Sequence, residues 1–128
     1  MDRPILYVNA CVRKDSRTKM LARKLLSKLC EPYEEICLEK IAFPLVNEEY
    51  LNKRDQLISS GNFQSPMFDL ARQFSEAETI VIAAPFWDLS FPAMLKQYLE
   101  QINVVGIALN HDALQSMAGG EGCIANLF

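Results

Sequence analysis

The sequence predicts an α/β fold: a doubly wound parallel β-sheet with helices on both faces, in three layers. Short apolar runs alternate with helical patterns along the chain, and this alternation favours parallel strands joined by right-handed crossovers. Residues 80–84 are apolar throughout, as expected of a strand that is covered on both faces. Because 128 residues suffice for one core but not for two, we expect a single domain over residues 1–128.

The first elements expected are a strand, a loop and a helix. Residues 5–8 form a short apolar run that ends at Asn9, as a buried strand does where it enters a loop. Asp15 or Ser16 can then cap a helix by accepting hydrogen bonds from its first free N–H groups. The apolar residues of this helix recur on one face: Leu21, Ala22, Leu25, Leu26 and Leu29.

A second strand and a short helix are expected next. Residues 35–38 have the pattern of the strand, and residues 41–44 are expected to be irregular because Pro44 lacks a backbone N–H group. Asn47 can cap a helix that continues through residues 51–57.

A third helix precedes the central strand. Ser65 and Pro66 are a favourable helix start, since the first can cap and the second has its φ angle preset for the first turn. Apolar residues then keep helical spacing at Met67, Leu70, Ala71 and Phe74. Residues 80–84 form the central strand.

The last elements extend the sheet. Pro92 opens a fourth helix, which we expect to end near Gly106, where a left-handed backbone is favourable. The right-handed crossover then delivers residues 123–128 beside the strand at 80–84. We therefore predict that these residues pair with it in parallel, giving the strand order 2-1-3-4.

Composition excludes several classes of protein. Half of the residues are hydrophobic and 23% are charged, unlike a disordered or fibrous chain. The formal net charge of −3 argues against broad attraction to nucleic acid or to an anionic membrane. No apolar stretch approaches the ~20 residues of a membrane-spanning helix. The N-terminus carries Asp2 and Arg3, so we expect neither an export signal nor an anchor.

The cysteines and the single histidine suggest no metal site. Cys11, Cys30, Cys37 and Cys123 are neither closely paired, as in a zinc site, nor dense, as in a disulfide scaffold. Reduced thiols in the cytoplasm are the simplest interpretation, and a cysteine-based redox or metal protein is the weaker alternative. Cys11 precedes a helix N-terminus, which can lower a thiol pKa, although a packed thiol is more common. His111 lies in a polar stretch, where solvation is much more common than ligation.

Two loops fall where an open sheet of this kind binds its ligands, beyond the carboxyl ends of the strands. The first, residues 9–18, ends at a helix N-terminus, whose free N–H groups and dipole suit a phosphate. It lacks the glycine pattern of dinucleotide or triphosphate loops. Basic and hydroxyl side chains gather in it: Arg13, Lys14, Ser16, Arg17 and Thr18. A helix cap with solvated basic neighbours explains this composition equally well.

The second loop, residues 85–92, follows the central strand and contains Phe86, Trp87 and Phe91. Its backbone can lie along the polar edge of a flat heterocycle while the aromatic rings cover the faces. Each of these aromatic residues, taken alone, is more commonly a core or interface residue. Their joint position favours a binding site.

Four segments carry a resemblance to a known family. They are ILYVNACVRKDSRTKMLARKLL, LEKIAFPLVN, ETIVIAAPFWDLSFPAMLKQYLEQI, and VVGIALNHDALQS with GCIANLF. Together they resemble the first strand and phosphate loop, the proline-containing stretch, the flavin-edge loop with its helix, and the approach to the fourth strand of the flavodoxin-like, FMN-dependent NAD(P)H:quinone oxidoreductases and azoreductases. The likeness runs from about residue 5 to residue 128.

The resemblance implies an activity, its cofactors and its site residues. FMN takes hydride from NAD(P)H and passes it to a quinone or azo-type acceptor, with no protein residue assigned as catalytic. It implies that the FMN phosphate is held by Ser16, Arg17 and Thr18. It also implies that the isoalloxazine is bordered by Pro85, Phe86, Trp87, Asp88 and Leu89. Such relatives are usually homodimers.

The chain also departs from the family pattern. Asp88 stands where relatives often carry Asn, and the family continues through a glycine-rich loop and a fifth strand with its helix. The sequence stops at Phe128, so we expect a fold that is truncated at its C-terminus and lacks the last strand and helix. The alternative function is a truncated flavodoxin-like binding or structural module without turnover.

Overall fold

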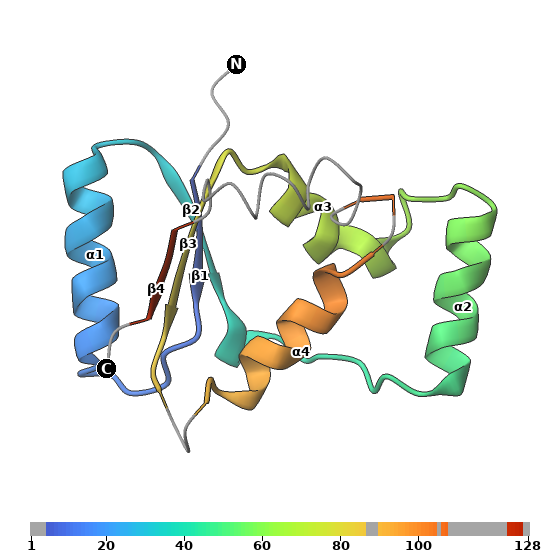
Figure 1. Ribbon diagram of the computed structural model, residues 1–128, viewed down its shortest axis with the longest axis horizontal. Coiled ribbons are helices and arrows are strands. Elements are labelled where there is room, and N and C mark those ends of the chain that lie inside the picture. Colours follow the sequence, from blue (N-terminus) through green and yellow to red (C-terminus); the bar gives the residue numbers. More distant parts are fainter. Residues whose placement is uncertain (1–4, 87–89, 105, 108–122, 127–128) are drawn as a thin grey trace.

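The computed structural model describes residues 5–86, 90–104, 106–107 and 123–126, and its centre is a parallel sheet (Figure 1). The four strands lie in the order β2-β1-β3-β4, which confirms the predicted 2-1-3-4 order. Their bounds are β1 Ile5–Asn9, β2 Tyr33–Cys37, β3 Thr79–Ala84 and β4 Cys123–Asn126. The predicted parallel pairing of the last strand is confirmed, with Val81 opposite Cys123 and Ala84 opposite Asn126.

Helices cover both faces of the sheet, as predicted. The bounds are α1 Arg17–Leu29, α2 Glu48–Ser59, α3 Asp69–Glu76 and α4 Ala93–Ile102, with 3-10 turns η1 Leu38–Lys40 and η2 Pro66–Phe68. In Figure 1, α1 lies on one side of the sheet and α3 and α4 on the other. Helix α2 stands beyond α3 and α4, away from the sheet, and none of its residues is fully buried.

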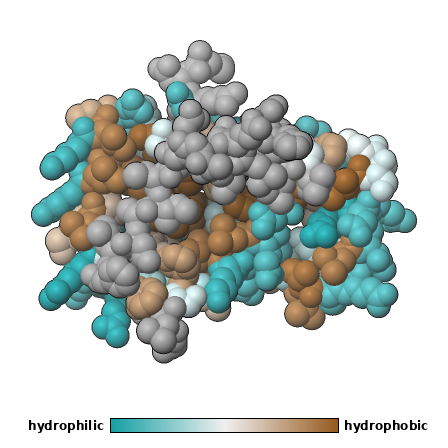
Figure 2. Space-filling model, viewed as in Figure 1, coloured by the Kyte–Doolittle hydropathy of each residue, from teal (hydrophilic) through white to brown (hydrophobic). Residues whose placement is uncertain are grey.

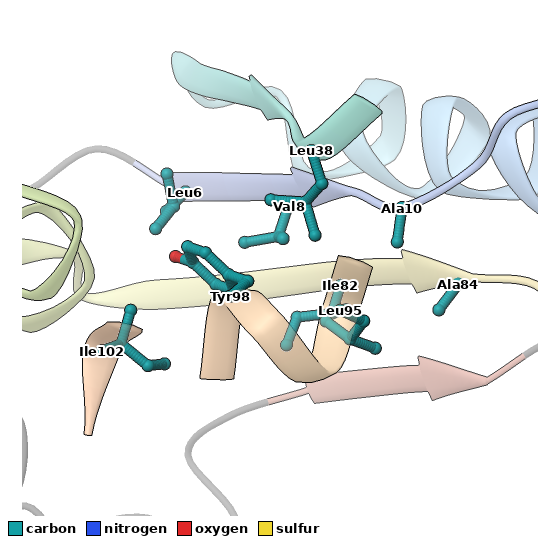
Figure 3. Close-up of a cluster of buried hydrophobic side chains, with 9 residues drawn as sticks. All are labelled: Leu6, Val8, Ala10, Leu38, Ile82, Ala84, Leu95, Tyr98 and Ile102. Carbon is teal, nitrogen blue, oxygen red and sulfur yellow. The ribbon is translucent and has the colours of Figure 1, made fainter. Parts of the chain in front are cut away.

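The core consists of two apolar layers, one on each face of the sheet. Successive residues of β1 point to opposite faces, so Leu6 and Val8 face α4 while Ile5 and Tyr7 face α1. Figure 3 shows the larger layer, in which Tyr98 and Leu95 of α4 pack over the side chains of β1 and β3. Burial on both faces explains why the run from 80 to 84 is apolar throughout.

The helix N-termini confirm the predicted caps. The side chain of Ser16 accepts a hydrogen bond from the Lys19 N–H group. Asn47 accepts one from Tyr50 and begins α2 at Glu48. Ser65 caps the start predicted for the third helix, although its first turn is the 3-10 turn η2.

Two predicted boundaries are wrong by a few residues. The second strand begins earlier and ends before Leu38, which instead starts η1 and packs under α4. Helix α4 ends at Ile102 rather than near Gly106, because Val104 turns inward and is buried. Gly106 does adopt a left-handed φ of 95°, and a Cβ atom there would lie 2.9 Å from the Phe63 ring.

The predicted apolar face of α1 is only partly buried. Ala22 and Leu26 are buried, whereas Leu21 is 43% and Leu29 is 40% exposed. The apolar residues of α1 keep regular helical spacing, but in the described structure other residues bury only part of this apolar face.

We expect Tyr98→Phe to raise the free energy of unfolding by about 1 kcal/mol, because the Tyr98 hydroxyl is buried with no hydrogen-bond partner in the described structure. Burial also raises the pKa of this hydroxyl, so it stays protonated. Urea unfolding checks the change. Tyr98→Ala is the control and should lose about 3–5 kcal/mol through the cavity it leaves. A loss of stability in Tyr98→Phe would contradict this account.

Candidate functional site

The two predicted site loops begin side by side, because β1 and β3 are neighbouring parallel strands. Asn9, the last residue of β1, is in register with Ala83. The Ala10 N–H group continues the pairing one step further by donating to the Ala83 carbonyl over 2.8 Å. The two loops therefore leave the sheet at the carboxyl ends of neighbouring strands, which is where ligands of open α/β sheets bind.

A buried turn fixes the start of the first loop. Asn9 is only 3% exposed, and its Oδ1 atom accepts a hydrogen bond of 2.9 Å from the Cys11 N–H group. The Cys11 thiol is buried among the side chains under α1 and lies 3.6 Å from the Ala83 carbonyl oxygen. Cys11 is therefore the packed thiol that we considered more common. Sequence reasoning missed the role of Asn9, although a polar residue directly after an apolar strand was a usable signal.

The first loop ends at the N-terminus of α1, where the structure distinguishes between the two candidate caps. Ser16 has an extended backbone and caps the helix, and its own N–H group donates to the Arg13 carbonyl over 3.2 Å. The Ser16 side chain is half-buried, Arg17 is exposed and Thr18 is buried. The first turn contains no acidic residue. This helix end therefore presents N–H groups, a hydroxyl and positive charge, which together suit a phosphate group.

The second loop is described only at its two ends. Pro85 is half-buried and Phe86 is 38% exposed beside the end of β3. Trp87, Asp88 and Leu89 lie outside the described residues. Phe91 is half-buried and packs against the core layer under α4. Of the two aromatic residues of this loop that are described, Phe86 is the more exposed.

Two cavities lie elsewhere in the described structure. One, of about 410 Å³, lies between the β2 side of the sheet and α3 and is lined by Leu6, Glu34 and several α3 residues. The other, of about 210 Å³, lies between residues 44–46 and α4. Neither is lined by a residue of the two loops, so neither is the predicted cofactor site.

The hydroxyl of Tyr7 is buried without a hydrogen-bond partner in the described structure. Burial raises its pKa above the usual range, and the neighbouring Cys11 and Glu35 add to the shift. Tyr7 therefore stays protonated and packs edge-on against Tyr33, with ring centres 6.1 Å apart.

Among the described residues, no group of three or more His, Cys, Asp or Glu side chains could hold a metal ion. None of the described helices is both long enough and apolar enough to span a membrane.

Comparison with known proteins agrees with this architecture. The model of the flavodoxin-like fold family matches residues 3–123. An FMN-dependent NADH:quinone oxidoreductase of Clostridium beijerinckii is 46% identical over 133 aligned positions, covering 95% of this chain and 63% of the relative. FMN-dependent NADH:quinone oxidoreductase 2 of Clostridium acetobutylicum is 58% identical over 114 positions, covering 84% of this chain and 56% of the relative.

A solved structure resembles the fold at lower sequence identity. An azoreductase from Bacillus anthracis superposes with a TM-score of 0.72 at 22% identity, covering 83% of this chain and 58% of that one. At this identity the likeness supports the fold alone. The chain spans only about 55–63% of the length of the curated relatives it matches.

We expect Asn9→Ala to destabilise the protein by about 1–3 kcal/mol, because it leaves the N–H group of buried Cys11 without its acceptor. Asn47→Ala is a matched control, since Asn47 makes the same type of bond at an exposed helix start where water can replace it. Urea unfolding of both variants checks the difference. An equal or smaller loss for Asn9→Ala would contradict the role given to this turn.

Proposed function

The chain belongs to the flavodoxin-like fold family, and on this basis we propose that it is an FMN-dependent enzyme transferring hydride from NAD(P)H to quinone or azo-type acceptors. The observation that carries the proposal is that the two loops leave adjacent strands, which are joined by the hydrogen bond from Ala10 to Ala83, and that the first of these loops ends at a phosphate-suited helix N-terminus. The names of the relatives from the two clostridia support the same chemistry.

The residues of the first loop fit a flavin phosphate. Ser16, Arg17 and Thr18 would hold it at the N-terminus of α1, where the helix dipole and the exposed guanidinium of Arg17 both favour negative charge. Ser16 can donate its hydroxyl proton to a phosphate oxygen while its oxygen still accepts the capping bond from Lys19. The buried Asn9 turn fixes the start of this loop.

The second loop would border the flavin ring. We assign this role to the loop residues Pro85, Phe86, Trp87, Asp88 and Leu89. Phe86 supports the assignment because it is partly exposed directly after β3, the strand that pairs with β1. When bound, FMN supplies the two-electron chemistry, while the protein binds the cofactor, orients it and controls access.

Assembly and location complete the proposal. We infer a homodimer in the cytoplasm, with a small-molecule electron acceptor as the partner in the reaction. The free thiols of Cys11, Cys30 and Cys37 support a reducing compartment. The inference of a dimer rests on the family resemblance.

Ser16→Asp tests the phosphate site without removing the helix cap, because Asp caps a helix as well as Ser does. Its carboxylate should repel the phosphate, so we expect FMN affinity to fall by more than about tenfold. Riboflavin, which lacks the phosphate, is the matched ligand and should bind both proteins equally. Fluorescence titration measures both affinities. Unchanged FMN affinity in the variant would remove the phosphate assignment.

We expect the FMN-loaded protein to oxidise NADH in the presence of a simple quinone, and Trp87→Ala to slow the reaction. The visible spectrum of the loaded protein first confirms that flavin is bound, and NADH absorbance then follows turnover. Loaded protein that fails to oxidise either NADH or NADPH would favour the binding or structural module instead.

A further inference from the structure

Charge is distributed unevenly along the chain. Residues 13–28 contain seven of the 13 Lys and Arg residues but only one of the 16 acidic residues, Asp15. This segment therefore carries a formal charge of +6, whereas the rest of the chain carries −9. The net charge of −3 thus conceals a strongly basic region, which consists of α1 and the loop before it.

One side of α1 faces the sheet, and the opposite side faces solvent. Ala22 and Leu26 are buried in the core layer that contains residues of β1 and β3. Successive residues of a helix are about 100° apart, so four exposed residues lie on the opposite side, within a sector of roughly 80°. They are Arg17, Met20, Lys24 and Lys28. In Figure 2, hydrophilic side chains line this outer edge of α1. We call these four residues, together with Arg13 and Lys14 of the preceding loop, the α1 basic face.

The cations of the α1 basic face are available to an external anion. All five are exposed. The salt bridges of the described structure are Arg54–Asp55 and Arg72–Asp69, so no carboxylate of the described residues neutralises the face. Neither of the two cavities described above is lined by one of its residues. The face is therefore suited to an extended anionic surface rather than to a small enclosed ligand.

Apolar side chains among these cations distinguish between the possible anionic surfaces. Met20 is 54% exposed within the face, and Leu21, which borders it, is 43% exposed. Such side chains can enter the headgroup region of a bilayer while long Lys and Arg side chains reach the lipid phosphates. Nucleic acid presents phosphates without a comparable apolar layer beneath them. The acidic remainder of the chain is repelled by an anionic bilayer, which leaves α1 as the side that approaches it.

We propose that the α1 basic face binds the surface of a bilayer that contains anionic phospholipids. Its five cations pair with the lipid phosphates, and Met20 enters the interface between them. The contact is peripheral and reversible. Because the loop that ends at α1 belongs to the candidate site, docking holds this site close to the lipid, where apolar quinones dissolve. This link to the acceptor rests on the proposed function, whereas the binding itself does not.

The first test needs no added flavin, so its failure is distinguishable from failure of the proposed function. The protein is sedimented with vesicles of equal parts phosphatidylglycerol and phosphatidylcholine, or of phosphatidylcholine alone. We expect binding to the mixed vesicles only, and weaker binding as salt is raised. Absence of binding at low salt, or equal binding to both kinds of vesicle, would overturn the proposal. Tighter binding to double-stranded DNA than to the mixed vesicles would identify a nucleic-acid surface instead.

Matched pairs of lysines locate the contact. Each Lys near an anionic bilayer strengthens binding by roughly fivefold, so Lys24→Gln with Lys28→Gln should weaken vesicle binding by more than about tenfold. Lys53→Gln with Lys96→Gln is the control, because both lysines are exposed, on α2 and α4, and the net charge changes equally. Glutamine is as good a helix former as lysine, so both variants should fold, which circular dichroism checks. Equal losses in the two variants would assign binding to net charge and overturn the role of this face.

Discussion

The parallel pairing of β1 with β3 is the constraint on which the rest of this structure depends. It places strands that are far apart in the sequence next to each other, with Ile5 opposite Thr79 and Asn9 opposite Ala83. The register determines which side chains meet in both core layers and where the two loops leave the sheet. If β1 shifted by one residue relative to β3, its side chains would exchange faces, so that those now packed against α4 would point toward α1. The shift would also separate Asn9 from Ala83.

The same pairing explains how an unremarkable loop becomes a candidate binding site. The basic residues before α1 are individually ordinary, and Ser16 would be a simple cap on any other helix. Here Ser16 follows a turn that is held by the Asn9 side chain. The second loop starts at the end of β3, the strand paired with β1, and its residue Phe86 is partly exposed. The chemical meaning of Ser16 thus comes from its position at the edge of the sheet.

Much of the fold could be predicted from the sequence because local and long-range signals agree. Ser16, Asn47 and Ser65 cap helices as expected, and the apolar run in β3 correctly indicated a central strand. Leu38 could not be placed, because a buried apolar residue at the end of a strand pattern serves equally well in a following turn. The packing of Phe91 against the core could likewise not be predicted, since the composition of its loop resembles that of a ligand wall. The positions of Leu38 and Phe91 both depend on tertiary packing against α4.

Helix α2 has a different relation to the sheet from the other helices. The Tyr50 hydroxyl of α2 donates a 2.8 Å hydrogen bond to the Gln101 side chain of α4. Leu57 and Ile58 of α2 pack against the small apolar cluster around Phe68. Because local opening of a segment costs only the contacts that it breaks, this helix can unfold while the sheet remains intact. Among the described helices, α2 is therefore the one whose amide protons we expect to exchange early and whose backbone we expect proteases to reach most readily.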